Sequence, residues 1–124
     1  MLHHVSLGTN DMARARAFYD AVLGVIGLRF LDAAFGLNYG TGSFLVSIVR
    51  PVDGQPATPG NGVHLAFAAG SRLMVNEFHR VALEHGGSSD GAPGPRPDYN
   101  PHYYGAFVRD PDGNKLEAVT YSAV

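Results

Sequence analysis

Two histidines occupy matching places in two copies of one short pattern. His4 lies fourteen residues before Phe18, and His64 lies fourteen residues before Phe78. In each copy the histidine opens an apolar, strand-like segment that is followed by a turn and a helical run. Equivalent residues of two repeats can face one another across a pseudo-twofold axis, and two imidazoles aimed at one point form the beginning of a metal site.

A third candidate ligand lies in the last predicted strand. Glu117 stands among apolar residues, four positions after Gly113. Because side chains alternate between the faces of a strand, His4, His64 and Glu117 are all expected on the cleft face. A buried carboxylate without a partner is unfavourable, and a divalent cation would offset that cost. The three residues therefore predict a site for one divalent metal, with positions left open for water or substrate.

The repeat also shows where a fourth ligand would lie. When Gly42 is matched to Gly113, Val46 takes the place of Glu117, and a shift of one residue puts Ser47 there instead. Neither side chain is a strong metal ligand. Ser47 is therefore a candidate for substrate binding only.

Several other polar residues are weaker candidates. His102 and Tyr104 are candidates for proton transfer, and Tyr103 is a candidate for substrate binding. Tyr103 and Tyr104 must point to opposite faces of their strand, so at most one of them lines the cleft. The alternatives are a loop histidine at position 102 and a Glu117 that is solvated or paired with Arg109 or Lys115.

Composition narrows the classes of protein that fit. The chain has 124 residues, of which 45% are hydrophobic and 16% charged, which is typical of one folded domain. Its net charge of -2 gives no reason to expect nucleic acid or an anionic membrane as a partner. There is no cysteine, no signal-peptide pattern at the first residues and no apolar run of the ~20 residues that span a bilayer. We expect a cytoplasmic protein without a membrane partner.

The order of elements predicts two modules of the type β-α-β-β-β within a single domain of residues 1–124. The modules cover about residues 2–50 and 63–121, and a linker rich in proline and glycine covers about 51–62. Asn10 or Asp11 is expected to cap the first helix and Ser71 the second. Strands are expected over 2–8, 28–31, 35–39, 44–49, 63–68, 103–109 and 115–121.

The segment 88–101 is rich in proline, glycine and aspartate and is expected to be a loop that shapes specificity, with at most one short strand. The expected class is α+β. Two βαβββ modules would form one curved mixed sheet, with helices on the convex side and a cleft inside.

These residues resemble a known family, the vicinal oxygen chelate superfamily, which includes glyoxalase I, bleomycin- and fosfomycin-resistance proteins and extradiol dioxygenases. The resemblance covers roughly residues 2–121. It is carried by His4-Val5, Phe18-Tyr19, Leu23-Gly24, His64-Leu65-Ala66-Phe67 and Asp110-Pro111-Asp112-Gly113-Asn114-Lys115-Leu116-Glu117.

The resemblance implies paired modules around one divalent metal (Fe, Mn, Zn or Ni) that binds adjacent oxygens of a small substrate. It places the ligands at His4, His64 and Glu117, and it implies a homodimer. The carboxylate that glyoxalase I carries in its first module is replaced here by Val46 or Ser47, which counts against a true lactoylglutathione lyase. The expected function is a metal-dependent enzyme of the glyoxalase or extradiol dioxygenase type. The alternative is a binding or resistance protein of the same fold that holds a drug-like or aromatic ligand.

Overall fold

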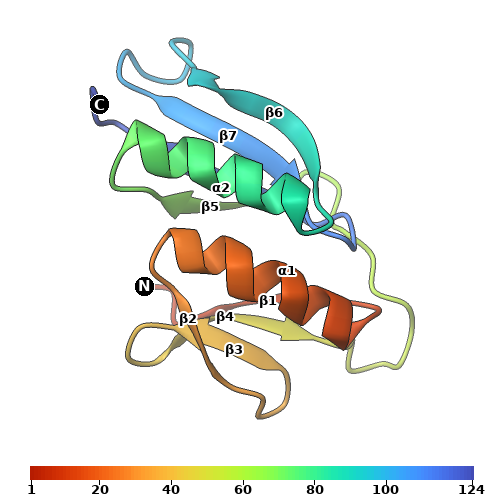
Figure 1. Ribbon diagram of the computed structural model, residues 1–124. Coiled ribbons are helices and arrows are strands. Elements are labelled where there is room, and N and C mark those ends of the chain that lie inside the picture. Colours follow the sequence, from red (N-terminus) through yellow and green to blue (C-terminus); the bar gives the residue numbers. More distant parts are fainter.

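Two modules of the same design follow one another along the chain in the computed structural model, which describes residues 1–124 (Figure 1). The first module contains β1 (Val5–Gly8), α1 (Met12–Val25), β2 (Arg29–Asp32), β3 (Leu37–Gly40) and β4 (Phe44–Val49). The second contains β5 (Leu65–Ala68), α2 (Arg72–Glu84), β6 (Ser88–Pro95), β7 (Tyr104–Arg109) and β8 (Lys115–Thr120). The α+β class with two βαβββ modules is confirmed.

Each module has its own four-stranded mixed sheet. The strand orders are β1-β4-β3-β2 and β5-β8-β7-β6, so the two sheets have the same topology. In each sheet the first strand pairs in parallel with the last, and the other pairs are antiparallel. The strands thus form two hydrogen-bonded sheets within one chain, and β1 and β5 are edge strands of these sheets.

The segment after α2 differs from the sequence prediction. Residues 88–95 form the eight-residue strand β6, where the sequence predicted a loop with at most one short strand. The pairing with β7 shifts its register at Gly91 and again before Gly94. Because β6 lies at the edge of its sheet, Pro93 and Pro95 can be accommodated in a strand that composition alone disfavours.

Local chemistry explains where both helices begin. The carboxylate of Asp11 accepts a hydrogen bond from the backbone N–H of Arg14 at 3.0 Å, and the hydroxyl of Ser71 accepts one from Met74 at 3.1 Å. These side chains satisfy N–H groups that have no partner within the helix. Both predicted caps, with Asp11 rather than Asn10 for the first helix, are confirmed. Neither helix is long and apolar enough to cross a membrane.

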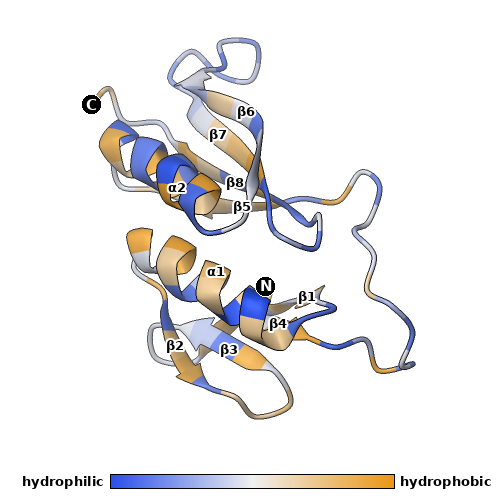
Figure 2. Ribbon diagram, turned by 45° about the vertical axis from the view of Figure 1, so that its right-hand side comes forward, coloured by the Kyte–Doolittle hydropathy of each residue, from blue (hydrophilic) through white to orange (hydrophobic).

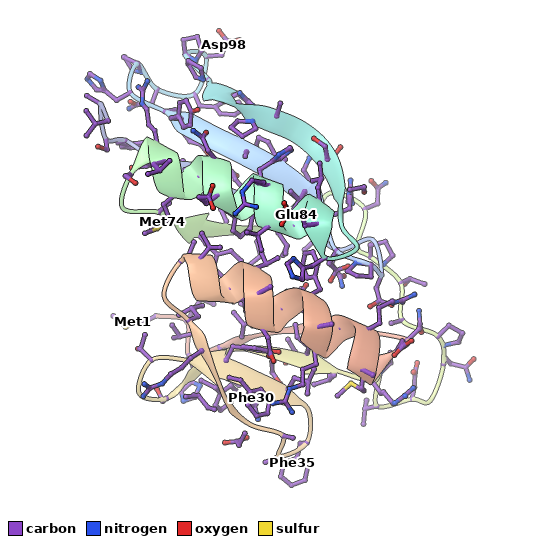
Figure 3. The ribbon with its side chains drawn as sticks, in the orientation of Figure 1. Met1, Phe30, Phe35, Met74, Glu84 and Asp98 are labelled. Carbon is purple, nitrogen blue, oxygen red and sulfur yellow. The ribbon has the colours of Figure 1, made fainter.

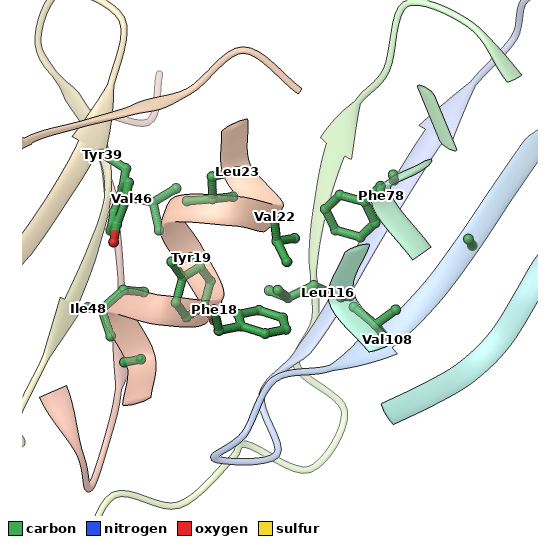
Figure 4. Packing of buried hydrophobic residues seen from close by; sticks show 14 of the residues in the cluster. Phe18, Tyr19, Val22, Leu23, Tyr39, Val46, Ile48, Phe78, Val108 and Leu116 are labelled. Carbon is green, nitrogen blue, oxygen red and sulfur yellow. The ribbon is translucent and has the colours of Figure 1, made fainter. Parts of the chain in front are cut away.

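One hydrophobic core joins the two modules, and α1 lies at its centre. Figure 4 shows Tyr19 of α1 directed toward Val46 and Ile48, while Phe18 is directed toward Leu116 of the second module. The two helices contact each other, and all of these side chains are buried. In Figure 2 hydrophobic colour covers much of α1, whereas α2 carries hydrophobic and hydrophilic residues in alternation. This difference follows because α1 is packed on two sides.

Polar contacts fasten the turn between β7 and β8 to the first module. The buried carboxylate of Asp110 accepts a hydrogen bond from the hydroxyl of Tyr19. Asp112 accepts bonds from the backbone N–H of Asn10 at 2.9 Å and from the guanidinium of Arg14 at 2.8 Å. The side-chain amide of Asn114 donates to the carbonyl of Gly8 at 2.9 Å. This turn therefore fixes the end of β1 beside the start of β8.

Candidate functional site

Glu117 is the centre of the candidate site. It lies in the middle of β8 and is only 1% exposed. Its Oε1 lies 3.0 Å from Nε2 of His64, the residue that precedes β5. The parallel register pairs Ala66 with Glu117, and alternation puts His64 and Ala66 on the same face. The fold therefore brings together two of the three predicted ligands.

Tyr103 forms a hydrogen bond with the second carboxylate oxygen of Glu117. Its hydroxyl donates a hydrogen bond to Oε2, and Tyr103 directly precedes β7, the strand next to β8. Burial and the adjacent carboxylate raise the pKa of Tyr103 above its usual value, so the hydroxyl keeps its proton. Tyr103 thus holds the carboxylate in one orientation, whereas the sequence predicted substrate binding for this residue.

His4 lies elsewhere in the molecule. Its ring is 4.5 Å from the ring of Phe44, and its Nδ1 is 2.8 Å from Nδ1 of His3, all within the first module. Met1, a few residues earlier, lies beside that module, whereas Asp98 marks the far end of the second (Figure 3). The structure contains no group of three or more His, Cys, Asp or Glu residues that could hold a metal ion.

The directions of the two edge strands show how His4 and His64 are separated. The end of β1 lies beside the start of β8, and β8 runs parallel to β5. Consequently β1 and β5 run in opposite directions, as Figure 1 shows. His4 lies just before β1 and His64 just before β5. Because the two strands run in opposite directions, the two histidines lie at opposite ends.

The sheet register decides which residue of the first module corresponds to Glu117. Ser6 pairs with Ser47 in the same way that Ala66 pairs with Glu117. The equivalent is therefore Ser47, and Val46 belongs to the core. Ser47 is buried and does not line the hollow beside Glu117.

Two other candidates do not reach Glu117. The hydroxyl of Tyr104 donates to Oδ1 of Asn76 on α2 at 2.7 Å, and the guanidinium of Arg72 lies 4.8 Å from the centre of its ring. Tyr104 therefore faces the helix. His102 is exposed in the loop before β7, and it is not among the residues that line the hollow.

A hollow of about 550 Å³ opens beside Glu117, His64 and Tyr103. Its other walls include Phe107, Arg96 and Lys115, which the sequence prediction had not assigned to the site. Alternation along β7 places Phe107 on the face of Tyr103, so Phe107 could have been found from the sequence. Arg96 could not, because the sequence predicted a loop around it.

The basic side chains near His64 are partly neutralised by one carboxylate. Asp90 lies 3.0 Å from Nε of Arg109 and 3.4 Å from Nζ of Lys115. Desolvation alone would raise the pKa of Asp90, but the charges of Lys115 and Arg109 outweigh it and lower this pKa.

The donor atoms of His64 and Glu117 fit a divalent metal, although the pair supplies only two ligands. An imidazole nitrogen and a carboxylate oxygen are the ligand types that Fe, Mn, Zn and Ni accept. A buried carboxylate whose neighbours are a half-exposed histidine and a tyrosine is also suited to bind a cation. Within a single chain, His64 and Glu117 are the only two of the predicted ligands that lie together.

The fold and this cleft-facing pair define a class of proteins built from paired βαβββ modules. Residues 1–118 match the model of the Glyoxalase/Bleomycin resistance protein/Dioxygenase superfamily, and the chain belongs to this superfamily.

Solved structures agree with this assignment. A glyoxalase/bleomycin resistance protein from Albidiferax ferrireducens T118 is 38% identical, with a TM-score of 0.86 over 96% of this chain and 97% of that chain. A putative glyoxalase from Bacillus halodurans is 28% identical, with a TM-score of 0.72 over 96% and 94% of the two chains. A lactoylglutathione lyase from Agrobacterium tumefaciens shares the fold at 20% identity, with a TM-score of 0.65 over 96% and 92%. No curated protein matches the chain.

Proposed function

We propose that this protein is a divalent-metal-dependent enzyme that acts on a small substrate through two adjacent oxygen atoms. The observation that carries the proposal is the buried Glu117 carboxylate, held by Tyr103 and lying 3.0 Å from His64 beside an open hollow. Fe, Mn, Zn and Ni are the metals that suit these ligands. Ser47 stands where a second carboxylate would be needed, which argues against a lactoylglutathione lyase.

We further propose that a second copy of the chain completes the ligand set with its His4. One chain offers two ligands at Glu117, while its own His4 lies within the first module. Both β1 and β5 are edge strands, and closed dimers are a common way to cover such edges. In a symmetric dimer the first module of each copy would face the second module of the other, which gives two equivalent sites.

The chain's own residues have distinct tasks in this proposal. The bound metal supplies a Lewis acid that stabilises negative charge on the substrate oxygens. Glu117 and His64 would hold the metal. Tyr103 keeps its proton and donates a hydrogen bond to one oxygen of Glu117, which orients the carboxylate.

Metal content tests the ligand set. Protein without a histidine tag, reconstituted with each of the four metals, should retain about one equivalent per chain. His4→Ala, His64→Ala and Glu117→Gln should each weaken retention at least about tenfold. His85→Ala is the matched control, because His85 lies at the end of α2 and bonds a backbone carbonyl there. Less than about one tenth of an equivalent in the wild type would count against metal chemistry.

Mixing two inactive variants tests whether the site lies between copies. When His4→Ala and Glu117→Gln chains are unfolded together and refolded, half of the dimers should contain one chain of each kind. Each mixed dimer carries one intact ligand set, so metal content should return to about a quarter of the wild-type value. A ligand set contained within one chain gives no recovery in this experiment.

A binding protein of the same fold is the alternative function. It is favoured by the finding that a single chain brings together no three metal ligands. Small-molecule binding that is unchanged by a chelator and by Glu117→Gln would support this alternative over the enzyme.

A further inference from the structure

We propose that the hollow beside Glu117 binds a small organic carboxylate and that Arg96 recognises its anionic end. The inference rests on the proposed function only in that Glu117 and His64 mark the reacting end of the same hollow. The recognition itself depends on Arg96 and the side chains around it.

Arg96 is a cation without an acidic partner. Its Nη2 donates to the carbonyl of Ala92 at 2.7 Å and its Nη1 to the carbonyl of Pro95 at 3.3 Å. Its guanidinium has no carboxylate oxygen within 4.0 Å. Two of its five N–H groups are therefore used and three are free to donate. A carboxylate matches the planar fork that they form.

The charges around the hollow favour an anion as well. Among the lining residues, Arg96 and Lys115 balance Asp90 and Glu117. Arg109, which lies outside the hollow, pairs with Asp90, so the group as a whole keeps one positive charge with His64 neutral. A divalent metal on Glu117 would add to this excess. An anionic ligand would balance it in a partly desolvated place, where charge pairing is stronger than in water.

The glycines of β6 make room for the guanidinium. A Cβ at Gly94 would lie 3.2 Å from Nη1 of Arg96, and a Cβ at Gly91 would lie 3.4 Å from Nη2. The Gly91 Cβ would also come within 2.9 Å of Cδ2 of Phe107. Two small residues and two carbonyls thus hold the guanidinium in place before any ligand arrives, which reduces the entropy lost on binding.

Phe107 provides an apolar surface between the cations and Glu117. The Arg96 guanidinium carbon lies 5.7 Å and Lys115 Nζ lies 5.0 Å from the centre of its ring. Phe107 pairs directly with Glu117 across the strands. A ligand can therefore place its carboxylate on Arg96, its apolar part against Phe107 and its other oxygens toward Glu117. A volume of about 550 Å³ suits a molecule of this size.

Benzoate and its neutral analogue benzamide test the inference by calorimetric titration of the full-length protein, with and without chelator. Wild-type protein should bind benzoate at least about tenfold more tightly than benzamide, and added NaCl should weaken benzoate binding. Arg96→Gln should remove this preference while metal content stays at the wild-type level. Arg29→Gln is the control, because Arg29 is an exposed arginine of the first module that also lacks a carboxylate partner.

A second variant keeps the charge of Arg96 and changes only the space around its guanidinium. Gly94→Ala crowds Nη1 and should weaken benzoate binding while the fold, followed by circular dichroism, remains that of the wild type. Equal affinity for the two probes, or an Arg96→Gln protein that still prefers benzoate, overturns the inference. Because benzoate binding and metal content are measured separately, failure of the metal site and failure of Arg96 recognition give different results.

Discussion

Glu117 is held in a defined state by two neighbours of different kinds. One oxygen faces the half-exposed ring of His64, while the other accepts a hydrogen bond from the hydroxyl of Tyr103. A carboxylate that is 1% exposed would be unfavourable without such partners. The tyrosine satisfies one oxygen, and the other lies beside the hollow where we propose that a metal binds.

Tyrosine ionisation gives a test at the scale of single residues. Burial, followed by a nearby carboxylate, raises the pKa of Tyr19, Tyr39 and Tyr103 above the usual value of about 10. Each neutral tyrosine therefore contributes stability that is fully present below pH ~10 and is lost as the pH rises toward the folded-state pKa.

Ultraviolet absorbance at alkaline pH should show these three groups ionising late, as the protein unfolds. Tyr103→Phe should reduce the late-ionising absorbance by about a third, since one of the three groups is removed. Tyr99→Phe is the control because Tyr99 is exposed. A Tyr103→Phe titration that leaves the late phase at full size would contradict the assignment.

At the scale of elements, both helices depend on a capping side chain at their first turn. Asp11→Ala and Ser71→Ala each remove one acceptor for a backbone N–H, and each should lower the free energy of unfolding by about 1 kcal/mol in urea. Ser43→Ala should change it little, because Ser43 is exposed in the connection between β3 and β4. A Ser71→Ala protein as stable as the Ser43→Ala control would show that the cap contributes nothing.

Strand β6 shows how an edge position changes what a sequence can form. Its glycines and prolines are poor strand formers, yet only one side of β6 needs a hydrogen-bonded partner. The same glycines leave space for the side chain of Arg96. The glycines that made this segment look like a loop in the sequence therefore also serve the proposed recognition of a carboxylate.

At the scale of the whole molecule, the turn between β7 and β8 couples the two modules. Asp110 is 4% exposed and accepts hydrogen bonds from Tyr19 and from the backbone and side chain of Asn114. Asp110→Ala leaves these buried donors without a partner and should lower the free energy of unfolding by about 3 kcal/mol. Urea unfolding followed by circular dichroism and by tyrosine fluorescence measures this loss.

Asp98→Ala is the control for this prediction, because Asp98 lies exposed at the far end of a loop (Figure 3). The two signals should coincide for wild type and control. They should separate for Asp110→Ala, since the module that loses its contacts unfolds first. An Asp110→Ala protein with wild-type stability would show that the core alone holds the modules together.

Residue patterns alone were enough to predict the features that depend on neighbouring residues. Alternation placed His64 and Glu117 on one face, and side-chain oxygens at Asp11 and Ser71 marked the helix starts, because these effects act over a few residues. The match of two short patterns likewise predicted two modules of one design.

The way in which distant segments meet is seen only in the folded chain. Folding placed the Tyr103 hydroxyl on Glu117, brought Arg96 to Phe107 through an irregular edge strand, and left His4 in its own module. These outcomes depend on the packing of α1 between both modules and on the opposite directions of β1 and β5. These contacts are stabilised by burial that involves residues from the whole chain. A local sequence pattern therefore does not predict them.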